Sequence, residues 1–254
     1  MALLLDGASA VAETTIERLT WAGVKLVHED TTVFIDAIGR DIWNGKAPGG
    51  LVPVSADTTR RFALITHAHN DHFDVETLHA VLGERGYVIV PESEATYVAS
   101  RGLRVIPAPM WQPVARGGFL FTAVPAVDGM GDNQVSWVVT VDNKRFFHGG
   151  DTLWHGHWSL LGQQFGPFDI AFLPVNGARV LQEPMPDSPI SMVPSQAIDA
   201  GRALRASTIV PIHYGLDDPP YYTEVEDAGR LFVEAAAGAG VQVREMRPGE
   251  RLLR

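Results

Sequence analysis

One short stretch constrains this chain more than any other, because an apolar run leads directly into a cluster of metal-binding residue types. Residues 61–66 are apolar and partly β-branched, as in a buried strand. The cluster that follows consists of His67, His69, Asp71 and His72. Imidazole and carboxylate groups hold zinc, manganese or iron when several of them converge on one ion. The stretch therefore predicts a metal site in a loop at the end of a strand, where a rigid scaffold presents the ligands.

The spacing within this cluster indicates more than one ion. His67 and His69 are alternate residues that can face one ion. The adjacent Asp71 and His72 are expected to point apart, so they would more naturally serve a second ion. The alternative is a polar loop whose histidines are only solvated.

With this motif the sequence resembles the metallo-β-lactamase superfamily, which draws its remaining ligands from distant loops in a fixed order. Residues 149–152, Gly-Gly-Asp-Thr, match the segment whose aspartate bridges two metals, here Asp151. Residues 211–215, Pro-Ile-His-Tyr-Gly, match the late loop that supplies the last histidine, here His213. The resemblance implies the four-layer αββα sandwich of that family, whereas the residue pattern alone supports only a layered α/β protein.

The opening segments resemble one branch of the superfamily, which includes L-ascorbate-6-phosphate lactonase and the phospholipase D that acts on N-acyl-phosphatidylethanolamine. Residues 19–27 and 32–36 are strand-like, and the turn-prone residues 29–31 separate them. In that branch the second strand usually ends in Asp-Pro, whereas this chain has Asp36 followed by Ala37.

One position departs from the family pattern. The strand predicted over residues 119–127 leads to Asp128, where related hydrolases have a histidine as the third ligand of the first metal. A carboxylate can also ligate, and it shifts the preference toward oxygen-loving ions such as manganese. The alternatives are that Asp132 substitutes for it, or that the first site is weakened and the protein uses one metal. The resemblance thus implies two divalent ions, zinc or manganese, held by His67, His69 and Asp128, by Asp71, His72 and His213, and by a bridging Asp151.

This ligand set implies hydrolysis. Two divalent ions that share a water lower its pKa, so that hydroxide is available near neutral pH to attack an ester carbonyl or phosphorus. The resemblance suggests a catalytic role for Asp71, which would orient that water or pass its proton to the leaving group. The expected substrate is a small ester, either a lactone or a phosphorylated lactone, and a phosphodiester is the alternative. An iron-dependent oxidoreductase of the same fold and a non-catalytic binding protein are the rival classes.

Several residues outside the ligand set are candidates for contact with a substrate. In residues 153–158, aromatic side chains can wall an apolar pocket while a histidine binds a substrate oxygen or moves a proton. A structural cap over the sheet explains the same tryptophans equally well. The glycine- and proline-rich residues 39–60 predict a loop on the rim of the metal cleft, or a surface loop without a ligand. The candidates are Trp43, Lys46, Trp154, His155, His157, Arg179 and Tyr214.

Composition limits the partners of this protein. With 254 residues, 46% of them hydrophobic, the chain can bury a sizeable core, and residues 1–254 are expected to form a single domain. A net charge of −10 argues against a nucleic-acid partner. Cysteine is absent, so the site uses no thiolate. No apolar run is long enough to span a bilayer, and residues 1–6 lack the basic region of a signal peptide. We therefore expect a cytoplasmic protein that acts on a small molecule, as a monomer or a homo-oligomer.

Strand and helix patterns alternate over the rest of the chain. Asp74 predicts the start of a helix that runs to residue 82, with Gly83 at its end. Residues 142–143, Asp-Asn, predict the tight turn of a hairpin between strands 134–141 and 144–148. Further strands are expected at 87–90, 103–106, 168–174, 207–212 and 241–243, and further helices at 93–100, 194–204 and 223–237.

Overall fold

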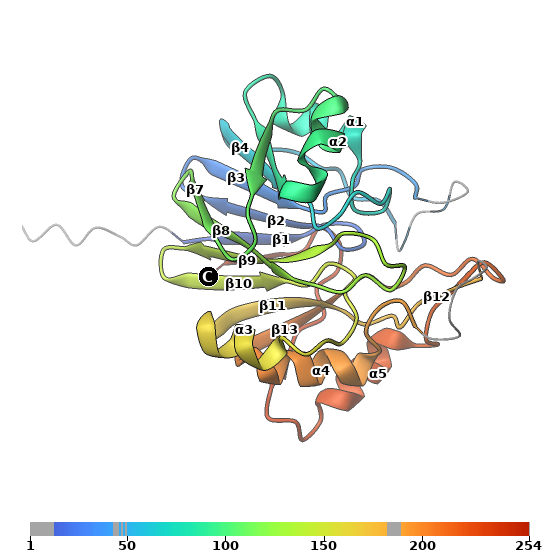
Figure 1. The fold of residues 1–254 in the computed structure, drawn as a ribbon. Helices are drawn as coiled ribbons and strands as arrows, with labels where there is room; N and C mark the ends of the chain where they lie inside the picture. The colour runs from blue at the N-terminus through green and yellow to red at the C-terminus, as the bar shows by residue number, and fades with distance from the viewer. Residues whose placement is uncertain (1–12, 43–45, 47, 49, 182–188, 254) are drawn as a thin grey trace, which may run out of the picture.

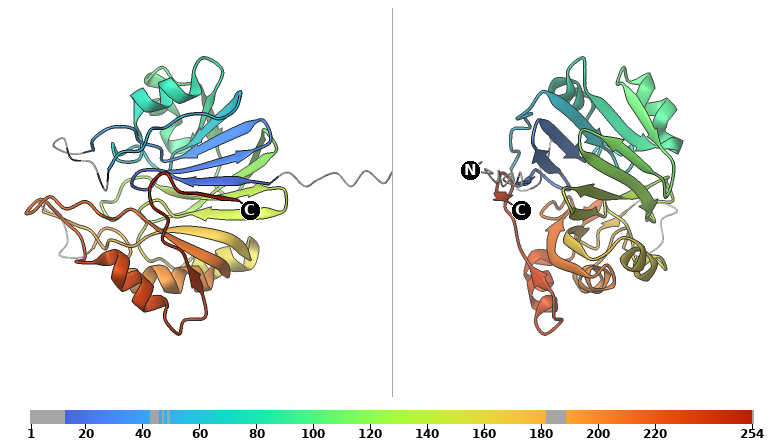
Figure 2. Two further views of the ribbon diagram at one scale, coloured as in Figure 1. Left: turned by 180° about the vertical axis from the view of Figure 1, so that it is seen from behind. Right: turned by 90° about the vertical axis from the view of Figure 1, so that its left-hand side faces the viewer.

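The computed structural model describes residues 13–42, 46, 48, 50–181 and 189–253. Within these residues, two seven-stranded sheets pack face to face, and helices cover the outer face of each sheet (Figure 1). Figure 2 shows the same sandwich from behind and from the side. The layers follow the order helices, sheet, sheet, helices, which confirms the predicted αββα sandwich.

The first sheet contains the amino-terminal strands and the last strand of the chain. Its strand order is β16-β1-β2-β3-β4-β5-β6. Pairing is antiparallel from β16 to β3 and parallel from β3 to β6. The strands are β1 (Thr15–Arg18), β2 (Val24–His28), β3 (Thr31–Ile35), β4 (Arg60–Leu64), β5 (Tyr87–Pro91), β6 (Val105–Ala108) and β16 (Arg251–Leu253). The helices on its outer face are α1 (Val75–Leu82), the 3-10 turn η1 (Glu92–Glu94) and α2 (Ala95–Ser100).

The second sheet has the strand order β15-β13-β11-β10-β9-β8-β7. Its strands are β7 (Pro113–Arg116), β8 (Phe119–Pro125), β9 (Val135–Val141), β10 (Lys144–His148), β11 (Phe168–Pro174), β13 (Ala206–Ile212) and β15 (Gln242–Val243). Its outer face is covered by α3 (Trp158–Gln164), α4 (Pro194–Ala203) and α5 (Ala228–Ala236). A separate pair, β12 (Arg179–Val180) with β14 (Tyr222–Thr223), lies outside both sheets.

The apolar core is divided by the sheets into layers. Val33 and Phe121 belong to the cluster between the two inner faces. Leu78 of α1 packs in a cluster on the outer face of the first sheet, and Phe232 of α5 packs in one on the outer face of the second. Successive residues of a strand point to opposite faces, so strands buried on both faces need continuous apolar runs. This requirement explains why residues 61–66 and 168–174 carry no hydrophobic alternation.

Two local predictions, the start and end of a helix and the turn of a hairpin, are confirmed by the residues on which they were based. The Asp74 side chain accepts a hydrogen bond from Thr77 N over 3.2 Å at the start of α1, and Gly83 follows its end with a φ of 56°. Between β9 and β10, Asp142 and Asn143 have φ values of 44° and 62°, which the two-residue turn requires.

The prediction of one strand over residues 19–27 is wrong. β1 ends at Arg18, β2 begins at Val24, and a tight loop of residues 19–23 lies between them. Leu19 N donates to Gly23 O over 2.8 Å, and Trp21 has a φ of 59°, which no strand residue adopts. Trp21 and Ala22 of this loop are buried in the cluster between the sheets, and Leu19 is buried in the cluster on the outer face of the first sheet.

The carboxy-terminal region also differs in its boundaries. The predicted helix 223–237 is shorter, since α5 begins at Ala228 after a residue, Asp227, with a φ of 55°. Strand β16 was not predicted, and it exists because β1 offers it an open edge. Within the described residues, no helix combines the length and the apolar character needed to cross a bilayer. The prediction made for residues 1–6 lies outside the described residues.

Candidate metal centre

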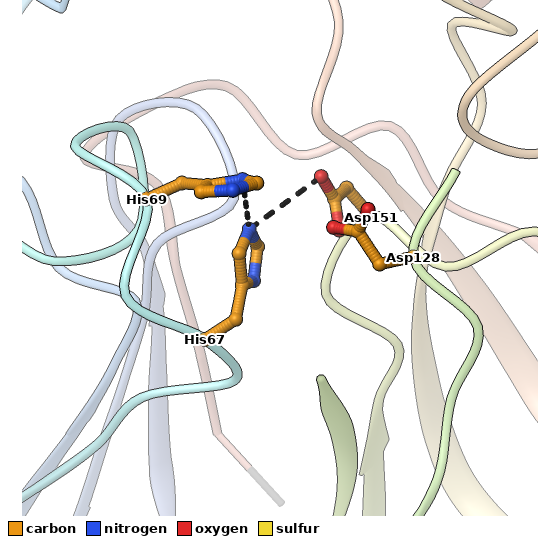
Figure 3. Close-up of side chains that lie close together, drawn as sticks. All are labelled: His67, His69, Asp128 and Asp151. Carbon is orange, nitrogen blue, oxygen red and sulfur yellow. Dashed lines mark hydrogen bonds and ion pairs between the residues drawn. The ribbon is translucent and has the colours of Figure 1, made fainter. Parts of the chain in front are cut away.

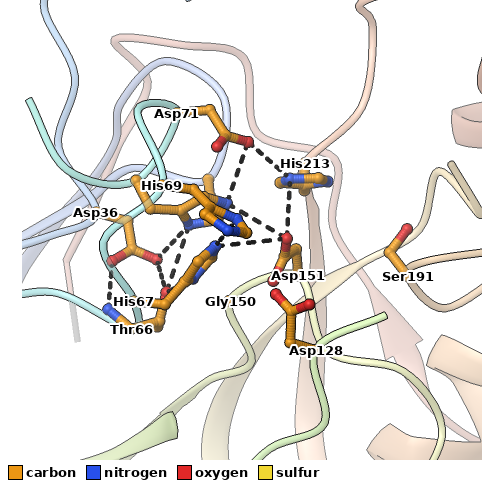
Figure 4. Close-up of polar contacts among 12 residues, drawn as sticks. Asp36, Thr66, His67, His69, Asp71, Asp128, Gly150, Asp151, Ser191 and His213 are labelled. Carbon is orange, nitrogen blue, oxygen red and sulfur yellow. Dashed lines mark hydrogen bonds and ion pairs between the residues drawn. The ribbon is translucent and has the colours of Figure 1, made fainter. Parts of the chain in front are cut away.

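The predicted ligands come together at one edge of the sandwich, from loops that belong to both sheets (Figure 4). Four of them follow β4 of the first sheet. The other three follow β8, β10 and β13 of the second sheet. In chain order the set is His67, His69, Asp71, His72, Asp128, Asp151 and His213.

A tight turn after β4 orients the first four side chains. His72 N and Phe73 N both donate to His69 O, over 3.0 and 2.8 Å. The turn brings Asp71 Oδ2 to 3.4 Å from His72 Nε2. The expectation that Asp71 and His72 point apart is therefore wrong, because the backbone turns between His69 and Phe73 instead of continuing in an extended form.

The first candidate group contains His67, His69, Asp128 and Asp151, with one ligand atom of each within 4.8 Å of the others. His67 Nε2 lies 2.9 Å from His69 Nδ1 and 3.7 Å from Asp151 Oδ2 (Figure 3). The outer nitrogen of His69, Nε2, contacts Asp132 Oδ2 at 2.9 Å. A neutral imidazole that donates from Nε2 keeps its lone pair on Nδ1, which faces the group. Asp132 thus contacts a member of the group and is not itself a member.

Asp128 lies in this group at the position predicted from the end of the β8 strand. Its Oδ1 accepts a hydrogen bond from Met130 N and a longer one from Asp132 N, at 3.4 Å. Burial, together with the nearby carboxylate of Asp151, raises the pKa of Asp128. Two carboxylates that oppose each other's ionisation are stabilised by a cation between them. Ligation by Asp128 stays a prediction, which its position in the group supports.

The second candidate group joins ligands from both sheets. His213 Nε2 lies 3.3 Å from Asp71 Oδ2 and 3.9 Å from Asp151 Oδ2. His72 Nε2 lies 3.4 Å from Asp71 Oδ2 and 3.8 Å from Asp151 Oδ2. Asp151 Oδ2 is therefore almost equidistant from three imidazole nitrogens, the third being His67 Nε2 at 3.7 Å.

Each of these three imidazoles has its other nitrogen paired with an oxygen. His67 Nδ1 contacts Thr66 Oγ1 at 3.0 Å, and Thr66 Oγ1 in turn donates to Asp36 Oδ2 over 2.8 Å. His72 Nδ1 lies 2.8 Å from Asp36 Oδ2, and His213 Nδ1 lies 3.3 Å from Asn176 Oδ1. Donation from Nδ1 leaves the lone pair on Nε2. The three lone pairs consequently converge on a carboxylate oxygen.

This arrangement of acceptors fits a metal ion. His72 Nε2 and Asp151 Oδ1 are buried and have no hydrogen-bond partner among the described residues. Buried polar atoms without partners are costly, and a cation at the centre would satisfy them together. Imidazole and carboxylate are also the ligand types that zinc, manganese and iron accept.

The pKa shifts of two histidines also fit a metal ion at this position. Burial lowers the pKa of His67 to about 4, so this imidazole is neutral and able to ligate at neutral pH. Burial opposes protonation of His72, but the carboxylates of Asp71 and Asp36 outweigh it and raise its pKa well above the usual value. The carboxylates beside His72 therefore favour a positive charge at that position, either a proton on Nε2 or a metal ion in its place.

The residues that orient the ligands were not predicted. Asp36, at the end of β3, accepts from Thr66 and His72, and Asn176, after β11, faces His213. Asp36 was noted only as the end of a strand-like segment, and Asn176 was not singled out. Their position after buried strands was the one signal available, because loops at the same sheet edge meet.

A cavity of about 50 Å³ opens beside the ligands. One side of it consists of the candidate ligands, and the other side is largely apolar. The lining residues are His69, Asp71, Asp128, Gly129, Met130, Asp151, Val180, Ile190, His213 and Tyr222. Among the described residues, no lysine or arginine lines this cavity.

The predicted substrate contacts are not among these lining residues. His155 is buried and stacks on Trp158, with ring centroids 4.3 Å apart, and Trp154 and His157 lie beside these two rings. Tyr214 packs in the apolar cluster under α4 and α5. The buried His155 and Trp158 fit the structural cap, whereas Trp154 is 44% exposed, so contact of these residues with a substrate stays a prediction.

The remaining two candidates with a described structure, Arg179 and Lys46, do not line the cavity. Arg179 is in β12, where its neighbour Val180 contributes to the lining. Lys46 Nζ forms an ion pair with Asp218 Oδ1 at 2.5 Å. Trp43 lies outside the described residues.

Comparison with known proteins identifies the family. Residues 31–214 match the model of the beta-lactamase superfamily domain. The chain is 30% identical over 245 residues to a UPF0173 metal-dependent hydrolase of Thermus thermophilus, covering 93% of this chain and 97% of the relative.

Solved structures share the fold at low identity. Igni18, a metallo hydrolase from Ignicoccus hospitalis, is 20% identical, with a TM-score of 0.72 and coverage of 95% of this chain and 98% of that one. CmlA, a diiron β-hydroxylase from Streptomyces venezuelae, is 18% identical, with a TM-score of 0.71 and coverage of 96% and 54%. From the family match and the Thermus relative we conclude that this chain belongs to the metallo-β-lactamase superfamily and, within it, to the UPF0173 metal-dependent hydrolases.

Proposed function

We propose that this hydrolase cleaves a small ester, either a lactone or a phosphorylated lactone, with two divalent ions, zinc or manganese. His67, His69 and Asp128 would hold the first ion, Asp71, His72 and His213 the second, and Asp151 would contact both. The observation that carries the proposal is the convergence of three imidazole nitrogens on Asp151 Oδ2 at 3.7, 3.8 and 3.9 Å. Asp151 would therefore be the residue that both ions share.

The chain's own residues would position the reactants. When bound, the ions supply Lewis acidity and lower the pKa of water. Burial alone would raise the pKa of Asp71, but His72 and His213 outweigh it and hold that pKa well below its usual value. Asp71 is therefore a carboxylate at neutral pH, so it can accept a hydrogen bond from the attacking water and orient it. Transfer of that proton to the leaving group is the second role we propose for it.

The cavity favours a small substrate with an apolar body. Its volume is about 50 Å³, and Met130, Val180 and Ile190 form an apolar wall opposite the ligands. The proposed ions could hold a phosphate at the reacting centre, but a phosphate remote from them needs its own cationic or N–H donors, and the described lining residues include no lysine or arginine. An unphosphorylated lactone therefore fits better than a phosphorylated one.

The test combines metal analysis with two assays. Protein purified without chelator would be analysed by elemental mass spectrometry, as wild type, as Asp128→Ala and as Asp199→Ala, whose carboxylate is exposed on α4. Each would be assayed with a neutral lactone and with an aryl phosphodiester. We expect close to two zinc or manganese ions per chain and lactone hydrolysis, with both reduced in Asp128→Ala and unchanged in Asp199→Ala.

Other outcomes would contradict parts of the proposal. A single metal that is unaffected by Asp128→Ala would remove Asp128 from the ligand set. Hydrolysis of the phosphodiester alone would replace the lactone, and two iron ions without hydrolysis would favour the oxidoreductase alternative.

A further inference from the structure

The loop of residues 19–23 reaches from the first sheet into the candidate metal centre. Its Trp21 side chain is buried, with 1% of its surface exposed. The indole Nε1–H donates to Asp71 Oδ2 over 3.0 Å. The same ring packs on the His213 imidazole, with centroids 4.1 Å apart and planes tilted by 43°. One side chain thus contacts two members of the second candidate group, which come from different sheets.

The indole contacts Asp71 at Oδ2, the carboxylate oxygen that faces the other members of the second candidate group. Asp71 Oδ2 also lies 3.4 Å from His72 Nε2 and 3.3 Å from His213 Nε2. A hydrogen bond to this oxygen restricts rotation of the carboxylate and leaves a further lone pair for a cation. Packing of the indole against His213 restricts rotation of the imidazole in the same way.

The loop itself is held from several sides, so Trp21 has little freedom to move. The Arg18 guanidinium is buried and donates to three loop carbonyls, Leu19 O at 2.5 Å, Gly23 O at 3.0 Å and Trp21 O. His148 Nε2, at the end of β10, contacts Ala22 O at 2.8 Å. His213 N donates to Trp21 O over 3.3 Å. A buried cation that satisfies three carbonyls permits a turn whose peptide groups would otherwise lack partners.

We propose that Trp21 is a positioning residue for the second metal ion, acting through Asp71 and His213, and that Arg18 holds the loop that presents it. The inference rests on the proposed two-metal site. It assigns the N–H group of the indole, and not only its apolar surface, a part in metal binding.

The test compares two matched substitutions. Trp21→Phe retains an aromatic ring against His213 but removes the donor to Asp71. Trp137→Phe removes an equally buried indole N–H, which donates to a backbone carbonyl, Ile65 O, over 3.0 Å. Both variants and the wild type would be titrated with Zn²⁺ and with Mn²⁺ by calorimetry. Binding of Co²⁺ would be followed by its visible absorption, which reports the coordination of the ion.

We expect Trp21→Phe to weaken the second equivalent of metal by roughly 10- to 100-fold, the usual effect of losing a group that orients a ligand, and to leave the first equivalent unchanged. Trp137→Phe should bind both equivalents as the wild type does. If Trp21→Phe also binds both equivalents normally, Trp21 only fills space and the inference is wrong. If the wild type itself binds fewer than two ions, the proposed two-metal site fails instead, so the two failures are distinguishable.

A second variant covers the case in which Trp21→Phe does not fold. Arg18→Lys keeps the positive charge, but its ammonium cannot reach three carbonyls in the geometry of the guanidinium. We expect faster hydrogen exchange at the Gly23 amide together with weaker binding of the second equivalent. Faster exchange with unchanged metal affinity would show that the position of the loop does not matter for the metal.

Discussion

The Asp36 carboxylate makes three contacts with residues that orient or belong to the candidate ligands. Its Oδ1 accepts from Thr66 N over 2.8 Å, and its Oδ2 accepts from Thr66 Oγ1 at 2.8 Å and faces His72 Nδ1 at 2.8 Å. Burial raises the pKa of Asp36, but the neighbouring His72 outweighs it, so the pKa is lowered and the carboxylate stays ionised. An ionised carboxylate at Nδ1 fixes the ring orientation of a ligating histidine and increases its basicity.

Replacement of Asp36 should therefore weaken metal binding from outside the ligand set. Asp36→Asn removes the charge and turns one acceptor into an amide donor that faces His72. We expect metal affinity to fall by roughly 10- to 100-fold, measured by calorimetric titration. The matched control is Asp74→Asn, another buried carboxylate, which accepts from Thr77 N and Gly39 N and does not touch the site. Equal metal affinity in the two variants would contradict the prediction.

At the scale of elements, a buried cation connects the edge of the first sheet to the segment before β4. Lys25 Nζ on β2 is 1% exposed and lies 2.7 Å from Glu17 Oε2 on β1 and 2.8 Å from Asp57 Oδ2. Arg251 on β16 also pairs with Glu17 Oε2, at 3.0 Å. A buried ion pair is not necessarily stabilising against an apolar replacement of both partners, but removal of one partner leaves a buried charge unpaired.

The predicted consequence is a large loss of stability without a loss of metal. Lys25→Met should lower the free energy of unfolding by about 3 kcal/mol, because Glu17 then keeps only its contact with the half-exposed Arg251. Arg230→Met is the control, since Arg230 pairs with Asp227 and Glu234 on the exposed face of α5. Its effect should be much smaller, because solvent screens an exposed ion pair. Urea unfolding curves of the two variants measure this difference, and similar unfolding midpoints would contradict the prediction.

At the scale of the whole molecule, the candidate ligands connect the two sheets. Four ligands follow β4 of the first sheet, and Asp128, Asp151 and His213 follow strands of the second. An ion that binds such a set binds only the folded chain, and binding then stabilises the sandwich as a unit. We propose on this basis that the sandwich unfolds as a single domain.

Removal of metal should therefore lower the stability of the whole sandwich. At a free metal concentration about 100 times the Kd, the metal-loaded protein should exceed the chelator-treated protein in the free energy of unfolding by about 2.7 kcal/mol for each bound ion. Asp151→Asn should abolish most of this difference, since Asp151 is shared by both groups. The measurement is a urea titration followed by circular dichroism and by tryptophan fluorescence. A metal effect seen by one probe only would mean that the ion stabilises one sheet, against the single-domain proposal.

Local patterns in the sequence were enough to predict most of the elements and four of the candidate ligands. The helix after Asp74 and the turn at Asp142 and Asn143 depend on hydrogen bonds and dihedral angles within a few residues, so the residue types reveal them. The cluster from His67 to His72 was evident because its members lie close together in the chain. Asp128, Asp151 and His213 were placed by resemblance to a family whose ligand order is constant.

Tertiary structure alone decided what orients those ligands and what surrounds them. Trp21 and Asp71 are separated by 50 residues, Asp36 and His72 by 36, and Asn176 and His213 by 37. Contacts of this kind exist only after strands such as β3 and β4, or β11 and β13, have paired, because long-range strand pairing and sheet packing determine which loops meet at a shared edge. The same reason explains the error at residues 19–23. An apolar run is read as a strand from its own residues, but Arg18, His148 and His213 stabilise a turn there by contacts that no local pattern encodes.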